Sequence, residues 1–446
     1  MDPIPCEVDT ALRRLTAAGF EAYLVGGCVR DALLGRPCSD YDVATSALPA
    51  EVEAVFAGEK LIETGLRHGT VTVLLAGRPV EITTFRVDGD YADARHPDAV
   101  AFTRSLTEDL ARRDFTVNAM ACGRDGALVD PFGGRRDLAA RVIRCVGDPA
   151  ARFGEDALRI LRALRFSAAL DFTIEPATAA ALRAQADRLA AVSAERVREE
   201  LTKLLCGVGA RRIVAAFADV LGAVLPELLP LRGFDQRSPY HALDALEHTA
   251  AVVAAVPPEP ALRWAALLHD IAKPETFSVG PDGIGHFYGH AARSAELADA
   301  AARRLRFSNT LRERVVLLVR EHGRQIEPTR PAVRRALAKL PPDAFFQLLE
   351  LMRADAAGHS AAGRARRVPT EEFRAVAEEL LRERACFSLR DLAVTGSDLL
   401  AAGCPPGPPV GAALSSLLGA VLDERVPNEK SALLALYAAQ KGDTSC

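Results

Sequence analysis

Several features that mark whole classes of proteins are missing from this 446-residue sequence. No apolar run reaches the roughly 18 residues that a membrane-spanning helix needs. The N-terminal stretch MDPIPCEVDT lacks the basic start and apolar core of a signal peptide. The nine cysteines form no CxxC pair, which argues against a disulfide framework or a zinc–thiolate site. We therefore predict a soluble, cytoplasmic protein with reduced thiols, no membrane association and no obligate protein partner.

Positive charge is not in excess either. The formal net charge of −4 at pH 7 argues against a protein that binds nucleic acid through its bulk charge. A nucleic-acid site would have to be a local basic face, for which the arginine clusters at 303–335 and 364–367 are candidates. The composition, 49% hydrophobic and 26% charged, is that of an ordinary globular protein, and the length suggests about three domains.

The residues that are present divide the chain into two parts. In the first 145 residues, runs rich in Val, Ile, Thr and aromatic residues alternate with helical patterns, and strands are predicted at 21–25, 41–45, 69–75 and 79–85. The remainder is rich in Ala, Leu and Arg, with helical periodicity almost to its end. The prediction is an α+β fold, with a mixed α/β head followed by an all-α body.

The stretch LVGGCVRDALLGRPCSDYDVAT (24–45) combines a glycine pair, an arginine and two aspartates. If Asp40 and Asp42 lie on one strand, their carboxylates point to the same side and favour a cation such as Mg²⁺ between them. Gly26 and Gly27 follow an apolar strand and precede a helix, where backbone amides favour phosphate, and Arg30 lies one turn further on. A plain surface turn would explain the aspartates alone, whereas the combination favours a phosphate-binding site.

The motif RRDFTVNAM (112–120) adds positive charge to the head. Arg112 and Arg113 would bring cations to a triphosphate, while apolar residues after Asp114 anchor the segment in the core. The plainer interpretation is a basic helix start with a salt-bridged aspartate.

The motif EDALRILRALRF (155–166) is predicted to form a helix with an arginine-rich face. Arg159, Arg162 and Arg165 are three residues apart and therefore share one face, which Asp156 joins. Taken alone, this face would be interpreted as a solvated surface whose side chains cover apolar neighbours.

Five ordered motifs make the sequence similar to the class II tRNA nucleotidyltransferases, the family of bacterial CCA-adding enzymes and their poly(A) polymerase relatives. The motifs are LVGGCVRDALLG…SDYD, RRDFTVNAM, DPFGGRRDL, EDALRILRALRF and AERVREEL. The resemblance implies a polymerase-beta-like nucleotidyltransferase head at 1–145, a helical neck at 146–215, a helical body at 216–390 and a tRNA-binding tail at 391–446. It implies addition of CCA to tRNA 3′ ends from CTP and ATP, with two Mg²⁺ ions. Addition of the terminal A alone, or poly(A) synthesis, stays an alternative.

The same resemblance implies roles for individual residues. The catalytic, magnesium-binding pair would be Asp40 and Asp42, with Glu81 only a guess for a third carboxylate. Asp156 and Arg159 would act as an amino-acid template that reads the edge of the incoming base. The nucleotide-binding residues would be Gly26, Gly27, Arg30, Arg112, Arg113, Asn118, Asp156, Arg159, Arg162 and Arg165. A brace for the template helix would come from Glu195, Arg196 and Arg198.

The polar stretch 86–107 shows no periodicity and is predicted to be a loop. Its segment DYADARHP is similar to the flexible loop that helps CCA-adding enzymes switch from C to A. The presence of this segment disfavours a relative that adds only CC, and leaves A-only addition and poly(A) synthesis open.

A second set of metal-ligating residue types lies in the helical body. LLHDIAKPETF carries His269 and Asp270, with His248 upstream and Asp355 downstream, an order similar to the HD phosphohydrolase superfamily. Five of the nine histidines fall between residues 241 and 290, which a satisfied-core explanation does not predict. Further possible ligands are His286 and His290, whereas ordinary histidines are expected at His241 and His322.

This second resemblance implies a divalent transition metal in the body. The HD site would either hydrolyse phosphomonoesters or 2′,3′-cyclic phosphates at RNA ends, or be only a structural part of the body. Two broader alternatives stay open: the HD site carries the main activity while the head recruits tRNA, or the protein is a non-catalytic RNA-binding scaffold.

Overall fold

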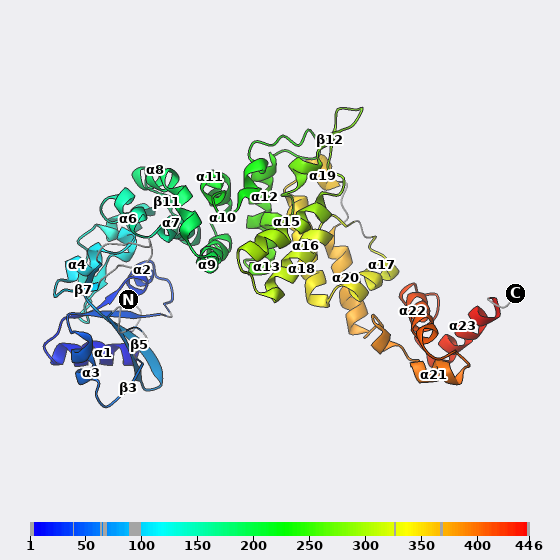
Figure 1. Cartoon of the computed structure of the whole chain (residues 1–446), viewed down its shortest axis with the longest axis horizontal. Helices are drawn as coiled ribbons and strands as arrows, with labels where there is room; N and C mark the ends of the chain where they lie inside the picture. The colour runs from blue at the N-terminus through cyan, green and yellow to red at the C-terminus, as the bar shows by residue number, and fades with distance from the viewer. Residues whose placement is uncertain are drawn as a thin grey trace. The chain divides into compact units, whose positions relative to one another are not determined.

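The structure is a computed structural model that describes residues 4–38, 40–62, 65, 69–88, 100–324, 327–365 and 369–443 (Figure 1). The chain forms two compact units, one of Met1–Leu229 with Arg304–Arg306 and one of Pro230–Arg303 with Phe307–Cys446. The first unit holds the large sheet and the second is almost entirely helical. The predicted α+β fold is confirmed.

The first unit is built on a seven-stranded sheet with the order β3-β4-β5-β2-β1-β8-β9. The strands are β1 (Ala22–Val25), β2 (Asp42–Thr45), β3 (Lys60–Ile62), β4 (Thr70–Leu75), β5 (Arg78–Thr84), β8 (Ala121–Cys122) and β9 (Leu128–Val129). Strands β2 and β5 run parallel, and β2 is antiparallel to β1. Because β2 is central, a residue at its first position lies between neighbours on β1 and β5.

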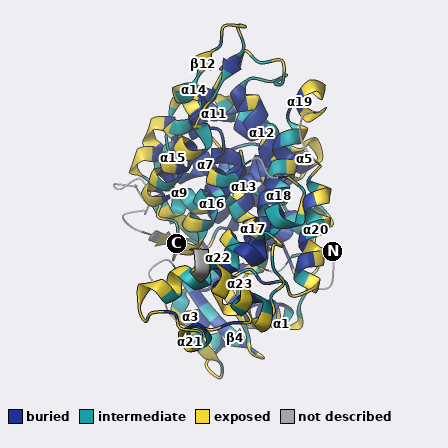
Figure 2. Ribbon diagram, turned by 90° about the vertical axis from the view of Figure 1, so that its right-hand side faces the viewer, coloured by how far each residue is buried: buried dark blue, intermediate teal, exposed yellow. Residues whose placement is uncertain are grey.

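Five helices belong to this head: α1 (Cys6–Ala17), α2 (Gly27–Leu33), α3 (Pro49–Val55), α4 (Leu106–Ala111) and α5 (Gly134–Ala140). In α1, Val8, Leu12 and Leu15 recur at helical spacing and are buried where the helix packs against β1, β2 and β5. Apolar residues of α4, Leu106 and Leu110, join Phe85 and residues of β1, β2 and β8 in a separate core cluster. Figure 2 shows the buried residues along the strands and on the inner sides of the helices.

The prediction of a continuous loop at 86–107 is wrong at both of its ends. Strand β6 (Arg86–Asp88) pairs antiparallel with β7 (Val100–Phe102), and α4 begins at Leu106. The hairpin pairs residues 12 to 16 positions apart, which local composition does not reveal. The segment DYADARHP lies outside the described residues.

The rest of the first unit is helical: α6 (Pro149–Glu155), α7 (Leu158–Leu170), α8 (Pro176–Ala184), α9 (Ala194–Leu205), α10 (Ala210–Ala216) and α11 (Ala218–Leu221). Two short strands, β10 (Val142–Ile143) and β11 (Thr173–Ile174), pair in parallel. The predicted helix over 155–170 is interrupted, because Asp156 has extended backbone angles (φ −138°, ψ 108°) between α6 and α7. Asp156 therefore does not lie on the arginine-bearing helix itself.

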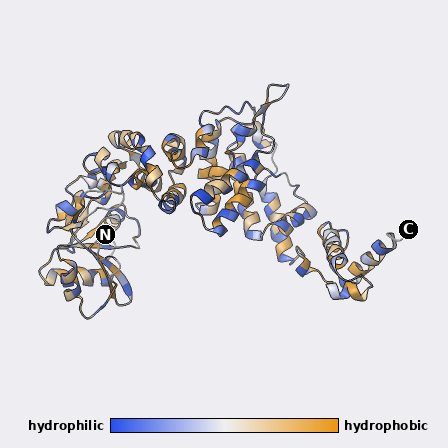
Figure 3. Cartoon of the chain, in the orientation of Figure 1, coloured by the Kyte–Doolittle hydropathy of each residue, from blue (hydrophilic) through white to orange (hydrophobic). Residues whose placement is uncertain are grey.

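The second unit begins with helices α12 (Ala245–Ala255), α13 (Pro260–Leu268), α14 (Lys273–Thr276), α15 (His290–Arg304), α16 (Asn309–Glu321), α17 (Arg330–Lys339), α18 (Pro342–Ala357), α19 (Ala361–Ala365) and α20 (Thr370–Arg382). A hairpin of β12 (Ser278–Val279) and β13 (Gly285–His286) interrupts the helices. Helices α12, α13, α16 and α18 pack together around fully buried side chains such as Trp264 and Phe345. Figure 3 shows hydrophobic and hydrophilic residues side by side along these helices, as expected of amphipathic helices.

The chain ends in a small cluster of helices, α21 (Gly396–Ala401), α22 (Pro408–Leu422) and α23 (Lys430–Asp443). Leu399, Leu417 and Leu433, one from each helix, are fully buried in a core of their own. None of the described helices is both long and apolar enough to cross a membrane. The described cysteines are free thiols.

Candidate functional site

The head site centres on Asp42, at the first position of β2. Its register neighbours are Val25 on β1 and Glu81 on β5. The chain turns directly after Val25, where Gly26 has φ +77° and precedes α2. The glycine turn after β1, the aspartate at the start of β2 and Glu81 in the middle of β5 are therefore neighbours across three adjacent strands.

The left-handed backbone of Gly26 also permits a close approach. A methyl group placed on this residue would lie 2.9 Å from Nη1 of Arg113 and 3.8 Å from Oδ2 of Asp42. Arg113 and Asp42 thus lie against the turn from two different segments. A substituted side chain would displace the arginine and would be strained at this φ.

Asp40 reaches the same region in a way that differs from the prediction. Strand β2 begins only at Asp42, so Asp40 lies in the segment before it, and strand alternation does not orient both side chains. The two carboxylates are nevertheless close enough to interact. Burial and the charge of Asp40 raise the pKa of Asp42, Arg113 opposes them, and Glu81 raises it further.

This donor set fits Mg²⁺. Asp42 has two acidic neighbours, Asp40 and Glu81, against one basic neighbour, Arg113, an arrangement that a divalent cation would stabilise. Asp40, Asp42 and Glu81 do not form a compact group of three donor atoms in the described structure, where such groups occur only in the second unit. Magnesium is commonly held by one or two carboxylates together with substrate phosphates, so Asp40 and Asp42 would be sufficient.

A buried aspartate orders the two arginines of RRDFTVNAM. Asp109, on α4, is 1% exposed and accepts a hydrogen bond at 2.9 Å from Nε of Arg112. Its other oxygen lies 3.5 Å from Nη2 of Arg113. The backbone N–H of Arg86, at the start of the β6–β7 hairpin, also donates to Asp109. Sequence reasoning missed Asp109, although it stands three and four residues before the arginines.

A second buried aspartate links the head to α7. Asp114 accepts hydrogen bonds from Nε of Arg162 at 2.7 Å and from the amide of Asn118 at 3.2 Å. The same Asn118 accepts from Nη1 of Arg30 at 2.7 Å, and Asp31 holds the rest of that guanidinium. Burial alone would raise the pKa of Asp114, but Arg162 and Asn118 lower it below its ordinary value. The carboxylate is therefore ionised and keeps Arg162 in place.

The side chains of the predicted base template, Asp156 and Arg159, contact other partners than each other, while the backbone N–H of Arg159 donates to the backbone oxygen of Asp156. Oδ1 of Asp156 accepts from the backbone of Leu158, and its Oδ2 accepts from Nη2 of Arg196 at 2.9 Å. Arg159 pairs with Glu155 at 2.5 Å and donates to the backbone oxygen of Arg112. Asp156 is thus held at the start of α7 and Arg159 against the arginine pair of the head.

The predicted brace from α9 consists of fewer residues than expected. Arg196 contacts Asp156, as predicted. Glu195 and Arg198 instead contact Arg306, through its guanidinium and its backbone oxygen respectively. The bracing contact from Glu200 was missed, and this residue pairs with Arg165 at 2.7 Å.

The arginine cluster at 303–335 does not form a free basic face. Arg314 pairs with Asp343, and Arg335 with Asp423. Arg330 contacts three carboxylates, those of Glu379, Glu383 and Glu424. In the other cluster, Arg364 donates to the backbone oxygen of His359, and the arginines at 366 and 367 lie outside the described residues. Much of the predicted positive charge is therefore compensated by acidic side chains.

The predicted HD residues come together in the second unit. His248, His269, Asp270 and Asp355 are all buried and offer donor atoms within 4.8 Å of one another. Nε2 of His248 lies 3.0 Å from Asp355, and Nε2 of His269 lies 3.1 Å from Asp270. Three helical segments far apart in the sequence contribute them, which local spacing alone could not establish.

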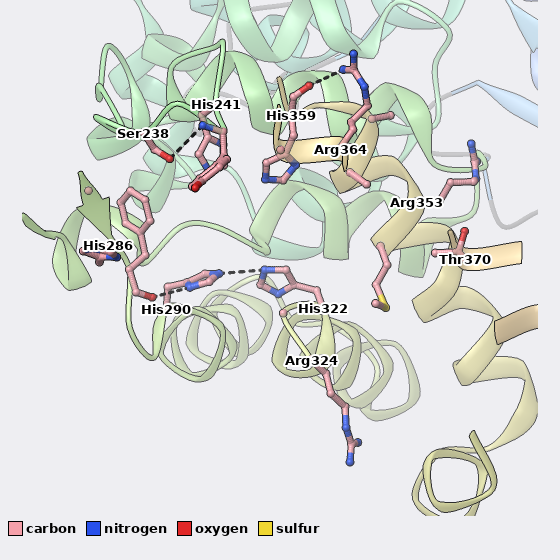
Figure 4. A pocket seen from close by; sticks show the side chains of 18 of the residues that line it. Ser238, His241, His286, His290, His322, Arg324, Arg353, His359, Arg364 and Thr370 are labelled. Atoms are coloured by element: carbon pink, nitrogen blue, oxygen red, sulfur yellow. Dashed lines mark hydrogen bonds between the residues drawn. The ribbon is translucent and has the colours of Figure 1, made fainter. Parts of the chain in front are cut away.

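Asp270 also belongs to a second group, with His290 and His322. Figure 4 shows His290 and His322 facing each other, with 3.3 Å between their Nε2 atoms. The expectation that His322 is an ordinary histidine is wrong, because the bundle places it 3.6 Å from Asp270. His286 is in neither group; its ring stacks on exposed Tyr288. His241 lies in ring contact with His248 and His359 beside the first group.

Hydrogen bonds fix the orientation of the histidine rings. In His269, His290 and His322, Nδ1 donates to a backbone carbonyl at 2.7–2.8 Å, which leaves Nε2 to face the acidic groups. Nε2 of His269 and Oδ1 of Asp270 are buried and make no hydrogen bond in the described structure, whereas Oδ2 of Asp270 is paired with Lys273. Imidazole nitrogens and carboxylates gathered in this way fit divalent transition metals.

The electrostatics of Asp270 are those of an ionised ligand. Burial would raise its pKa, but His269 and Lys273 hold it well below the usual range. Nζ of Lys273 lies 2.6 Å from Oδ2 of Asp270. Beside these groups lies a cavity of about 1100 Å³, lined among others by His290, His322 and Tyr288. A cavity of this size can hold a small molecule.

Family models match both parts of the chain that carry these groups of residues. The Poly A polymerase head domain matches residues 22–144, and the "Probable RNA and SrmB- binding site of polymerase A" matches 171–229. The HD domain matches 240–372, and tRNA nucleotidyltransferase domain 2 matches 350–437. The CCA-adding enzyme of Lacticaseibacillus paracasei is 36% identical over 434 residues, which cover 97% of this chain and 96% of that protein.

The chain belongs to the family of CCA-adding enzymes.

Other members show how the similarity is distributed. The CCA-adding enzyme of Limosilactobacillus fermentum is 49% identical over 222 residues, which cover 49% of this chain and 55% of that protein. The crystal structure of the Bacillus stearothermophilus CCA-adding enzyme in complex with CTP matches with a TM-score of 0.69 and 31% identity, covering 100% of both chains. The resemblance to class II tRNA nucleotidyltransferases with an HD domain is therefore confirmed.

Proposed function

We propose that this protein adds CCA to the 3′ ends of tRNAs from CTP and ATP in the cytoplasm, without a nucleic-acid template. The observation that carries the proposal is the meeting of Asp42, Gly26 and Arg113 at one edge of the sheet. A carboxylate, a turn that leads into the first amides of a helix and an arginine are the groups that a nucleoside triphosphate needs.

In each step, the 3′ oxygen of the tRNA forms a bond to the α-phosphorus of the nucleotide. The bond between that phosphorus and the β-phosphate oxygen breaks, pyrophosphate leaves, and the hydroxyl proton passes to solvent. Asp40 and Asp42 would hold Mg²⁺, which lowers the pKa of the attacking hydroxyl and offsets charge on the leaving group. The amides after Gly26, with Gly27 at the start of α2, and the side chains of Arg30 and Arg113 would hold the triphosphate.

We assign the choice of base to the residues at the start of α7. The backbone of Leu158 and Nη2 of Arg196 fix Asp156, and Glu155 fixes Arg159, so their donors and acceptors are held in one arrangement. Fixed polar groups reject a base whose edge leaves them unpaired.

We also propose the division of the chain that the sequence predicts. Its four parts are head, neck, body and tail, with boundaries at 145, 215 and 390.

The experiment gives the purified protein tRNAs that end before, within and after the CC, with labelled CTP or ATP. The proposal requires CMP on the first, CMP on the second and only AMP on the third. Failure to incorporate CMP on any of them would favour the A-adding or poly(A) alternative.

A second candidate activity has its own support. The buried group of His248, His269, Asp270 and Asp355 lies beside a cavity of about 1100 Å³ and favours a metal-dependent phosphohydrolase. A suitable substrate class is phosphomonoesters or 2′,3′-cyclic phosphates at RNA ends. Release of phosphate or opening of the cyclic ester, in the presence of Mn²⁺ or Ni²⁺ and abolished in Asp270→Asn, would support it.

A further inference from the structure

Three guanidinium groups surround one buried aromatic ring in the neck. Phe166, on α7, is 6% exposed, and its ring centroid lies 3.8 Å from Cζ of Arg165. The corresponding distances are 5.2 Å to Arg30 and 5.4 Å to Arg162. Phe115, from the RRDFTVNAM motif, meets the same ring edge-on with 5.7 Å between centroids. Arginines from the head and from the neck therefore converge on Phe166.

Three cations this close repel one another. Burial lowers the pKa of Arg165, Glu200 raises it, and the charge of Arg162 lowers it again. Arg30, Arg162 and Arg165 each contact one carboxylate already, those of Asp31, Asp114 and Glu200. A further carboxylate would add negative charge where the triphosphate is to bind. An aromatic face attracts cations through its quadrupole and leaves their net charge intact.

We propose that Phe166 is a positioning residue for the nucleotide, a neutral platform that holds Arg30, Arg162 and Arg165 together, without adding negative charge, so that their guanidinium groups are arranged for the triphosphate. The proposal rests on the proposed nucleotide addition. It assigns to the ring, and not only to the acidic partners of these arginines, the pre-organisation of the binding site. Because Arg30 belongs to the head and the other two to the neck, the ring also sets the distance between phosphate and base contacts.

The test compares Phe166→Leu with Phe172→Leu. Phe172 is 2% exposed and has one arginine, Arg141, at 5.6 Å from its ring, remote from the proposed nucleotide contacts. Both changes remove a buried ring, so both lower the thermal midpoint of unfolding. Only Phe166→Leu should weaken CTP binding, by about tenfold for three contacts of modest strength, and raise KM for CTP and ATP more than it lowers kcat. Phe166→Tyr, which keeps an aromatic ring, should bind CTP and ATP with the affinities of the wild type.

A second experiment changes the quadrupole of the ring while keeping the volume of the side chain nearly constant. Phenylalanines with one, two and three ring fluorines, introduced at position 166 by amber suppression, weaken the quadrupole stepwise. The inference predicts that CTP affinity falls stepwise along this series, whereas the same series at position 172 has no effect. A flat series at 166, or equal losses in the two leucine variants, would overturn it.

The outcomes separate this inference from the proposed function. If the wild-type protein binds CTP and the Phe166 variants bind it as weakly as predicted, but the wild type adds no nucleotide, only the proposed function is contradicted. A wild-type protein that adds CCA and is indifferent to the ring contradicts this inference alone. Absence of any CTP binding contradicts both.

Discussion

Replacement of Asp114 by asparagine tests whether the head and α7 are held together by one buried charge. The aspartate is 7% exposed, and it accepts from Nε of Arg162 at 2.7 Å, with Nη2 at 2.6 Å. It also accepts from the backbone N–H of Phe115 and from Asn118. Asparagine keeps the shape but leaves the guanidinium of Arg162 without its counter-charge.

The expected loss follows from the burial of the pair. Breaking a buried ion pair from one side costs about 3–5 kcal/mol. The side chain of Arg162 is 34% exposed, so solvent screens part of this and we expect the lower end, about 3 kcal/mol. For a unit of this size such a loss lowers the thermal midpoint by roughly 6–12 °C.

The lowered pKa of Asp114 also predicts how the stability difference between the wild type and Asp114→Asn changes with pH. The folded state lowers the pKa of Asp114, so its contribution to stability is complete above the ordinary aspartate pKa of about 3.9 and is lost as the pH falls through the lower folded value. The wild type should therefore exceed Asp114→Asn by the full amount at pH 7, and the gap should narrow below about pH 4.

The assay is thermal unfolding, followed by circular dichroism or calorimetry, at pH 7 and at a pH below about 4. A matched control is Asp171→Asn, because Asp171 is half exposed and pairs with Arg141 and Arg212 at 3.4 Å each. Exposed pairs of this kind are worth less than about 1 kcal/mol. A loss for Asp114→Asn no larger than the control, or a gap that does not narrow in acid, would refute the reasoning.

Two further predictions concern the turn and the second metal group. Gly26→Ala places a methyl group 2.9 Å from Arg113 at a φ of +77°, so we expect loss of most nucleotide incorporation and about 1–2 kcal/mol of stability. The control, Gly19→Ala, has a φ of +88° with open space around it and should lower stability without affecting nucleotide incorporation. Equal incorporation by the two variants would count against the site. His322→Ala should lower the number of Mn²⁺ ions bound per chain, measured by equilibrium dialysis, by about one, because it removes a ligand of the second group. His286→Ala should leave that number unchanged. A number unaffected by His322→Ala would exclude the second group.

Local chemistry made much of the head predictable. The glycine pair between a strand and a helix, and Asp42 at the start of the next strand, follow from residues within twenty positions of each other. Glu81 was only a guess, because its place beside Asp42 depends on the parallel pairing of β2 and β5, which sequence spacing does not specify. The break at Asp156 is a local feature that the uninterrupted helical pattern of the surrounding residues concealed.

The remaining differences arise from contacts between distant segments. His322 lies 52 positions after Asp270, and only the packing of the bundle reveals that they meet. Arg330 pairs with Glu424 from the tail, so a cluster that seems basic in the sequence loses its excess charge in the fold. The order of motifs predicted the family, whereas the partner of each charged side chain required the three-dimensional arrangement.

The central claim is that nucleotide addition depends on the carboxylate of Asp42. The most direct measurement offers wild-type protein and Asp42→Ala a tRNA that lacks CCA, with CTP, ATP and Mg²⁺, and sequences the 3′ ends of the products. We predict that the wild type adds C, C and A and then stops, while Asp42→Ala leaves the tRNA unchanged and keeps any phosphohydrolase activity. A wild type that adds no C, or a variant that adds CCA at the wild-type rate, would contradict the account.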